Sequence, residues 1–133
     1  MALGVRGIVV DGEGRVLPVR HTYAPGSHFP GGGLEKGETA VLSMRRELKE
    51  EAGNETATGT MGLLSVHANR SYFPNDHVLA YRIDTWRQGK ASSRGEIAEV
   101  QFVDPLMPPE GVSPATRRRL DELFAGADTS ELW

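Results

Sequence analysis

The sequence predicts a single α/β domain over residues 1–133. Its length allows one hydrophobic core to form without metal or disulfide support, and leaves no room for a second domain of ordinary size. Runs rich in β-forming residues stand before and after one amphipathic helical segment, and a second helical segment follows near the end. The lack of cysteine, with 38% apolar and 25% charged residues, excludes collagen-like, disulfide-stapled and low-complexity classes.

The first part of the chain predicts a β-hairpin and a loop. Residues 5–10 and 15–20 are β-rich runs joined by Asp11-Gly12-Glu13-Gly14, in which Asp-Gly is a strong hairpin signal. Residues 21–33 contain two prolines and four glycines, so we expect a loop with at most a short strand inside it.

The segment from Thr39 to Gly53 predicts the first helix. Thr39 is a suitable N-cap, and Gly53 suits the left-handed residue just past a C-terminus. Between them apolar residues recur at spacings of three and four, namely Val41, Met44, Leu48 and Ala52.

Three strands and a second helix are expected after it. The strands cover residues 56–68, 77–86 and 98–103, with a turn at 69–76 between the first two. Ser113 and the proline after it predict the start of a helix that continues to residue 124.

The predicted second helix carries three consecutive arginines at 117–119. We interpret them as its solvated side rather than as an RNA site, because acids follow at Asp121 and Glu122. Residues 127–133 are expected to form a loosely held, flexible tail.

Three carboxylates share one stripe of the first helix. With Glu47 at zero and about 100° per residue, Glu50 lies about 60° to one side and Glu51 about 40° to the other. This acidic stripe is unfavourable locally, because Glu47 and Glu51 repel each other and all three oppose the helix dipole. Hard oxygen ligands in such a cluster suit Mg²⁺ or Mn²⁺. The alternative is a solvated acidic face eased by neighbouring cations, Arg45, Arg46 and Lys49.

Three consecutive glycines, Gly31 to Gly33, stand just before this helix. Such a run is entropically unfavourable unless the backbone passes close to something, and a ligand or metal is the natural candidate. The loop is not a phosphate-binding P-loop, because Lys36 precedes Gly37 and no Gly-Lys-Ser/Thr is present. The alternative is simply a flexible turn.

Loop and helix together resemble the Nudix box, G-x5-E-x7-R-E-U-x-E-E-x-G-U, of the MutT-like Nudix hydrolase family. The matching residues over 32–54 are Gly32-x5-Glu38-x7-Arg46-Glu47-Leu48-x-Glu50-Glu51-x-Gly53-Asn54. Only Asn54 departs from the pattern, where the family has a bulky apolar residue. The order of the predicted elements is also similar to a minimal Nudix domain. The resemblance therefore implies an α/β/α sandwich with a mixed sheet between helices.

The resemblance implies a pyrophosphohydrolase. Nudix enzymes hydrolyse a nucleoside diphosphate linked to another group, using divalent cations that help a water molecule to attack phosphorus. Carried over by position, Glu47, Glu50 and Glu51 are the metal-binding carboxylates, and the carbonyl of Gly31 adds a ligand. The expected cofactor is Mg²⁺ or Mn²⁺.

The remaining box positions receive supporting roles from the same resemblance. Arg46 orients a glutamate by a salt bridge and counts with Glu47 and Glu50 among the catalytic residues. Glu38 braces the loop against the helix, and Gly53 is likewise structural.

The general base is left open between a box glutamate and an acid from a later loop. Glu96 is the candidate for the later acid, because its segment looks like the one that delivers an extra acid in some relatives. Glu99 and Asp76 are rivals, and a surface-turn role for Glu96 is the alternative.

Substrate contacts are expected around the glycine loop. Arg20 and Tyr23 are candidates for a phosphate contact and a stacking ring, together with the backbone of Gly32 and Gly33. His21 and His28 flank the same loop, and residues 69–77 form a second candidate specificity loop. A structural or merely exposed role is the alternative for each.

Charge and hydropathy indicate which binding partners and which cellular compartment to expect. The net charge of −3, from 18 acids and 15 bases, gives no basic field for long nucleic acid. Apolar runs are far shorter than the roughly 20 residues that cross a bilayer, and no signal peptide is recognised, so we expect a cytoplasmic protein. The sheet edges and the tail around Trp133 are candidate surfaces for a homodimer.

Two other classes remain as alternatives. A catalytically weak nucleotide-binding sensor domain would be expected to have lost box acids and to carry a second module, and this chain retains the acids. A purely structural domain is the third alternative. The sequence does not choose among nucleotides, nucleotide sugars and related substrates.

Overall fold

The structure is a computed structural model that describes residues 2–21, 26–70, 75–91 and 97–133. A four-stranded sheet lies at its centre, with strand order β4-β1-β7-β6. The strands are β4 (Gly31–Gly33), β1 (Ala2–Val9), β7 (Asp76–Ile83) and β6 (Met61–Ala68). Because β1 and β7 run parallel while the other pairs are antiparallel, the sheet is mixed, as expected.

Shorter strands extend the molecule beside this sheet. A three-stranded sheet has the order β3-β2-β9, and a two-stranded sheet pairs β5 with β8. Their bounds are β2 (Val19–His21), β3 (Ser27–His28), β9 (Ile97–Val100), β5 (Asn54–Glu55) and β8 (Arg87–Gln88). A single 3-10 turn, η1 (Thr58–Thr60), precedes β6.

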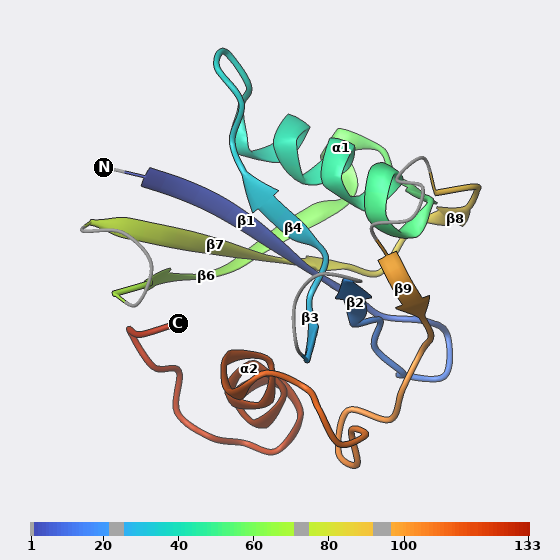
Figure 1. Cartoon of the computed structure of the whole chain (residues 1–133), viewed down its shortest axis with the longest axis vertical. Helices are drawn as coiled ribbons and strands as arrows, with labels where there is room; N and C mark the ends of the chain where they lie inside the picture. Colours follow the sequence, from blue (N-terminus) through green and yellow to red (C-terminus); the bar gives the residue numbers. More distant parts are fainter. Residues whose placement is uncertain (1, 22–25, 71–74, 92–96) are drawn as a thin grey trace.

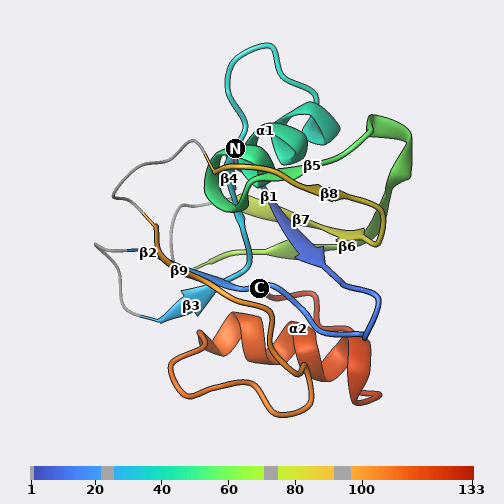
Figure 2. The same ribbon diagram turned by 90° about the vertical axis from the view of Figure 1, so that its right-hand side faces the viewer.

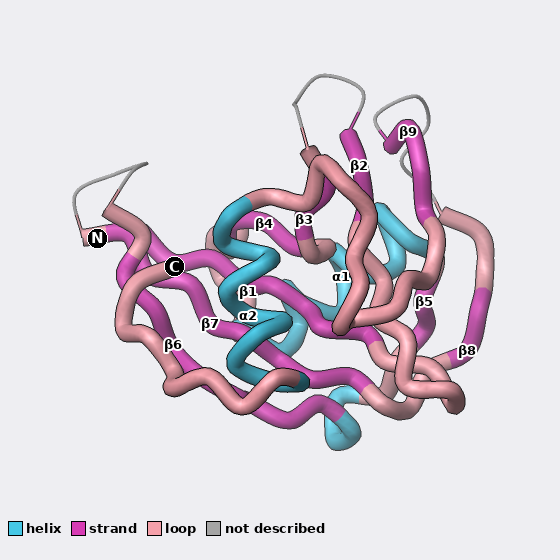
Figure 3. Tube along the Cα trace, turned by 90° about the horizontal axis from the view of Figure 1, so that it is seen from below, coloured by secondary structure: helices cyan, strands magenta, loops and turns pink. Residues whose placement is uncertain are grey.

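Two helices cover opposite faces of the main sheet, α1 (Ala40–Ala52) above and α2 (Pro114–Phe124) below (Figures 1 and 2). Successive side chains of a strand point to opposite faces. Accordingly Val5 and Val9 of β1 belong to the buried cluster that contains residues of α1, whereas Ile8 packs in the cluster that contains Leu120 of α2. The α/β/α sandwich predicted from the sequence is therefore confirmed. Seen from below, α2 crosses the main sheet over β1 and β7 (Figure 3).

The two predicted helices are confirmed together with their caps. Thr39 caps α1 by accepting a hydrogen bond from the Leu42 amide, and Gly53 ends the helix in the left-handed conformation with φ 75°. Ser113 caps α2 in the same way through the Thr116 amide.

The predicted opening hairpin is much shorter than expected. The chain does turn at residues 11–14, where the Asp11 carboxylate accepts hydrogen bonds from the Glu13 and Arg15 amides. Across this turn the Asp11 amide donates to the Arg15 carbonyl and the Leu17 amide to the Val9 carbonyl, around an isolated antiparallel bridge between Val10 and Val16. β7 pairs with one edge of β1 along its whole length, and β4 takes the other edge at Gly4 to Arg6. The second run therefore stays with β1 only next to the turn, and its later part, β2, pairs with β3 and β9.

The predicted strands are shorter than expected at their ends. β6 begins at Met61, because the residues before it form η1, and β7 ends at Ile83. The glycine-rich loop contains two short strands, β3 and β4, rather than one at most.

The C-terminal residues are bonded to the body of the protein, in contrast to the loosely held tail that the sequence predicted. The Ala68 amide donates to the Glu131 carbonyl at 2.8 Å, and the Trp133 amide donates to the Ala68 carbonyl at 2.9 Å. The indole of Trp133 meets the ring of buried His67 edge-on, with centroids 5.5 Å apart. The contact follows from the edge of β6 offering unpaired backbone groups.

The interpretation of the three arginines as a solvated side is wrong for one of them. Arg119 is only 1% exposed and forms an ion pair with Glu122 at 2.7 Å. Its guanidinium also lies 5.0 Å from the centre of the Trp133 ring. Arg117 and Arg118 are exposed, as expected.

Candidate active site

The glycines of β4 allow two very close approaches. A side chain at Gly31 would overlap the carbonyl oxygen of Val5 on β1, and a Cβ at Gly32 would lie 2.7 Å from Oε1 of Glu47. At Gly33 a Cβ would meet open space in the described structure. The backbone therefore passes close to strand β1 at Gly31 and close to the acidic stripe at Gly32.

Arg46 joins the loop to the acidic stripe. Its Nε and Nη2 form a two-pronged contact with the Glu38 carboxylate at 2.7 and 3.0 Å. Its Nη1 donates to Glu47 at 3.0 Å and to Glu50 at 3.2 Å, and Nη2 reaches the Gly33 carbonyl at 3.4 Å. One guanidinium thus fixes the relative positions of the loop, the brace residue and two acids of the stripe.

Glu38 connects this arginine to the turn that precedes α1. Its Oε1 also accepts a hydrogen bond from the Glu35 amide at 2.8 Å. The hydrogen bonds from Arg46 and from that amide lower the pKa of Glu38 to about 2, so the carboxylate stays charged. The pKa of Arg46 is raised in turn, chiefly by its hydrogen bonds to Glu38.

The acids of the stripe differ in exposure. Glu51 is 8% exposed and Glu47 12%, whereas the Glu50 side chain is 43% exposed. Oε2 of Glu51 accepts a hydrogen bond from the Gly31 amide at 3.0 Å. Burial, aided by the charges of Glu47 and Glu50, raises the pKa of Glu51 to about 7 despite that hydrogen bond. Burial likewise raises the pKa of Glu47, against the opposing effect of Arg46.

The donor set of the stripe fits a divalent cation chemically. Among the described residues, no three His, Asp or Glu side chains are already gathered at metal-binding distance. The carboxylates of the stripe are instead turned toward Arg46 and toward the Gly31 amide. Buried and mutually repelling carboxylates are stabilised by a bound cation, and oxygen ligands are those that Mg²⁺ and Mn²⁺ prefer.

Arg6 of β1 is a component of the site that the sequence interpretation missed. Its Nη1 donates to the carbonyls of Phe29 at 2.8 Å and of Gly31 at 3.4 Å. Its positive charge acts against the burial that raises the pKa of Glu47 and Glu51. The available signal was a lone arginine inside the apolar run of residues 5–10.

The described residues cover the candidates for a later-loop general base only in part. Glu96 lies outside those residues. Glu99 has its backbone on β9, paired with Arg20 of β2. Asp76 accepts a hydrogen bond from Asn69 at 3.3 Å, across the ends of β6 and β7.

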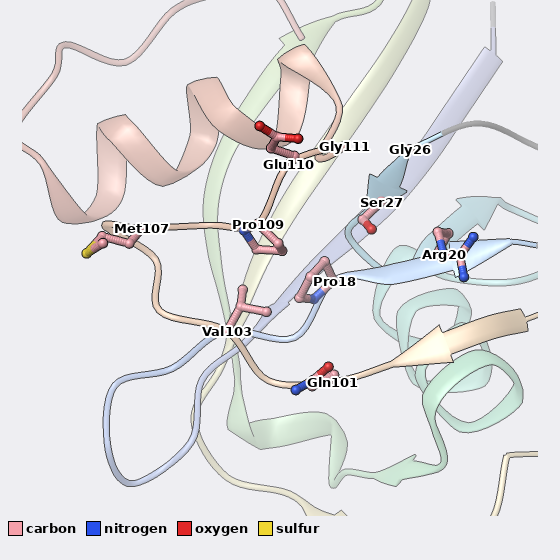
Figure 4. A pocket seen from close by; sticks show the side chains of 10 residues that line it. All are labelled: Pro18, Arg20, Gly26, Ser27, Gln101, Val103, Met107, Pro109, Glu110 and Gly111. Atoms are coloured by element: carbon pink, nitrogen blue, oxygen red, sulfur yellow. The ribbon is translucent and has the colours of Figure 1, made fainter.

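Of the predicted substrate contacts, Arg20 lines a pocket and Tyr23 lies outside the described residues. The pocket has a volume of about 400 Å³. Arg20 and Ser27 approach it from β2 and β3, while Gln101 and Glu110 come from the chain after β9 (Figure 4). Residues 71–74 of the second candidate loop also lie outside the described residues.

The fold and the arginine-bridged acidic stripe define the class, an α/β/α sandwich of the Nudix type. The chain belongs to the Nudix family, because the family model described as the NUDIX domain matches residues 1–124. Membership makes it a hydrolase acting on phosphoanhydride bonds, in a family that acts on small nucleoside diphosphate derivatives and generally needs divalent cations.

Solved structures agree with this fold. A MutT NUDIX hydrolase from Burkholderia pseudomallei superposes with a TM-score of 0.77 at 20% identity, covering 92% of this chain and 97% of that one. The Escherichia coli ORF135 protein gives 0.74 at 22% identity, covering 94% and 89%. A structure titled UDP-X diphosphatase gives 0.62 at 20% identity, covering 94% and 63%. A comparison with curated proteins gave no match.

Within the described residues, neither α1 nor α2 has the length and apolar character that a bilayer crossing requires.

Proposed function

We propose that this protein is a divalent-cation-dependent pyrophosphohydrolase that cleaves the diphosphate of a nucleoside diphosphate linked to another group. The observation that carries the proposal is the gathering of Glu47, Glu50 and Glu51 beside the glycine strand, with two of the three largely buried. A buried cluster of like charges is unfavourable in the absence of a counter-charge, so it supports a site built for cations.

The acidic stripe and the Gly31 carbonyl would hold Mg²⁺ or Mn²⁺. When bound, the cation would neutralise diphosphate charge and lower the pKa of the attacking water. Arg46 orients Glu47 and Glu50 through its Nη1, and Glu38 holds Arg46 from the other side. Gly53 is structural in this scheme, since it ends α1 just after the last acid.

In the hydrolysis, a general base accepts one proton from the attacking water while the water oxygen bonds to phosphorus. The bridging P–O bond breaks, and the bridging oxygen leaves with the other phosphate. We propose Glu96 for this role, with a box glutamate as the alternative. Contact with the rest of the substrate is proposed for Arg20, which lines the pocket of Figure 4, for Tyr23, and for the backbone of Gly32 and Gly33.

A substrate screen tests the function. Nucleoside triphosphates, dinucleotide polyphosphates, ADP-ribose, nucleotide sugars and NADH are incubated with Mg²⁺ or Mn²⁺, and released phosphate monoesters are detected. Nucleotide sugars are included because one similar structure is titled UDP-X diphosphatase. We expect turnover of at least one class. Tight nucleotide binding without turnover across the panel would favour the sensor alternative.

Matched variants test the residues. Glu50→Gln and Glu51→Gln should reduce Mg²⁺-dependent turnover by orders of magnitude, since each removes a proposed ligand charge. Glu96→Gln should lower kcat with little change in metal affinity. Glu13→Gln, at a carboxylate whose side chain is 75% exposed on the 11–14 turn, is the control. Undiminished turnover in both stripe variants would refute the metal assignment, and a wild-type rate for Glu96→Gln would return the base to the box helix.

A further inference from the structure

The guanidinium of Arg6 lies beside the acidic stripe without an ion pair in the described part of the chain. Its Nη1 is held by the carbonyls of Phe29 and Gly31, at 2.8 and 3.4 Å. These carbonyls are neutral, so the positive charge of Arg6 is not cancelled by its own partners. Its field nevertheless reaches Glu47 and Glu51, where it opposes the effect of burial on their pKa.

The route of this side chain follows from the strand register. Arg6 stands opposite Gly31 in the β1–β4 pair, and its neighbour Val5 packs with the residues of α1. By strand alternation Arg6 leaves β1 on the opposite face. It can then reach the carbonyl of Gly31 because β4, Gly31–Gly33, carries no side chains that would obstruct it. Arg6 and Glu51 thus meet the same residue, Gly31, from the two faces of the sheet, through its carbonyl and its amide. Because β4 is an outer strand of the main sheet, a diphosphate that crosses this edge can reach both Arg6 and the acidic stripe.

The donors that remain on Arg6 are arranged for an anion. Only Nη1 is engaged, so Nε and Nη2 have no hydrogen-bond acceptor among the described residues, and the side chain is half-buried. An Nε/Nη2 pair presents two parallel N–H groups, the geometry that matches two oxygens of a phosphate. Anchoring by the two carbonyls fixes the fork in advance, which reduces the ordering cost of binding.

We propose that Arg6 binds a phosphate group of the substrate diphosphate through Nε and Nη2. The inference rests on the proposed function, because it takes a diphosphate as the substrate. Arg6 would supply protein-borne positive charge next to a stripe that by itself repels such a substrate. The other interpretation is a structural tie, in which Arg6 only holds the Phe29–Gly31 segment against β1.

Analogue binding separates these interpretations. The probe is α,β-methylene-ADP, a nucleoside diphosphate that resists hydrolysis, titrated calorimetrically in Mg²⁺ into wild type, Arg6→Gln and Arg6→Lys. Arg6→Gln retains donors for the carbonyls but loses the charge and the fork, and we expect its affinity to fall roughly 10- to 100-fold. Arg6→Lys retains the charge and should lie between. The control is Arg117→Gln, at an exposed arginine of α2, and it should bind as wild type does.

A second readout tests for a purely structural role. Mn²⁺ affinity without nucleotide, measured by electron paramagnetic resonance, should not weaken in Arg6→Gln, because no metal ligand has been removed. Thermal melting followed by circular dichroism should show a folded variant. A parallel loss of Mn²⁺ and analogue affinity would overturn the proposal, since Arg6 would then act by positioning Gly31.

Analogue binding tests the role of Arg6, whereas the substrate screen tests the proposed hydrolase activity, so each can fail without the other. Equal analogue affinity in wild type and Arg6→Gln, or no analogue binding by the wild type, overturns the inference even if the substrate screen finds turnover. Analogue binding that depends on Arg6 supports the inference even if the screen finds no turnover.

Discussion

Replacing Glu51 by glutamine should stabilise the metal-free protein at alkaline pH. Burial raises the pKa of Glu51 from its ordinary value of 4.5 to about 7. The folded state therefore holds a proton that the unfolded state has released between these values, so the free energy of unfolding falls as pH rises through that window. At roughly 1.36 kcal/mol per pKa unit, the full effect above about pH 7 is about 3 kcal/mol.

Urea unfolding in EDTA measures this effect. Glutamine retains an acceptor for the Gly31 amide, which donates to Glu51 at 3.0 Å, so the substitution mainly removes the buried charge. We expect Glu51→Gln to be about 3 kcal/mol more stable than wild type near pH 8 and less than about 1 kcal/mol more stable near pH 5. Glu50→Gln, at a side chain that is 43% exposed, controls for loss of one charge from the stripe. Equal stability near pH 8, or a difference that does not change with pH, would refute the reasoning.

Three further substitutions follow from the contacts of the site. Gly32→Ala should weaken Mn²⁺ binding at least about 10-fold while the protein stays folded, because the added Cβ would lie 2.7 Å from Glu47. Gly33→Ala is the control and should leave Mn²⁺ binding unchanged, because a Cβ there faces open space in the described structure. Arg46→Lys should lose the fork and lower the free energy of unfolding by about 1–3 kcal/mol in urea titrations, and unchanged stability would contradict the bridging role. Asn54→Leu restores the apolar residue of the box and removes a buried side-chain oxygen that has no partner in the described residues. Thermal melting should show that the folded state is about 1 kcal/mol more stable. A loss of stability would mean that the hydrogen bond from the Asn54 amide to Gln88 of β8 contributes more.

The parts of the fold that the sequence predicted well are those decided by neighbours in the chain. Thr39 and Gly53 bound α1 because capping depends on a few adjacent residues, and the acidic stripe depends only on helical spacing. The pairing of β1 could not be predicted in this way. Its partner β7 begins more than 60 residues further along the chain. A local Asp-Gly turn signal carries no information about whether such a distant strand will pair with β1.

In the site, too, contacts between residues near in sequence were predicted and contacts between distant segments were not. The contact between Arg46 and Glu38 joins two residues of the box, and their roles as a bridge and a brace stay predictions. Arg6 was overlooked because its contacts to Phe29 and Gly31 arise only once β1 lies against β4. Likewise, Arg119 resembles a solvated helix residue until Trp133 covers it.

The seating of residues 131–133 against β6 has a consequence for solubility. β6 is an outer strand of the main sheet, and its side chains Leu63 and Val66 are 56% and 51% exposed. Outer strands with apolar side chains can template the addition of another chain. The backbone hydrogen bonds of Glu131 and Trp133 to Ala68 occupy the free backbone groups at one end of this outer strand. These last residues thus shorten the edge open to self-association, and protein cut back before residue 130 should aggregate more readily in light-scattering measurements.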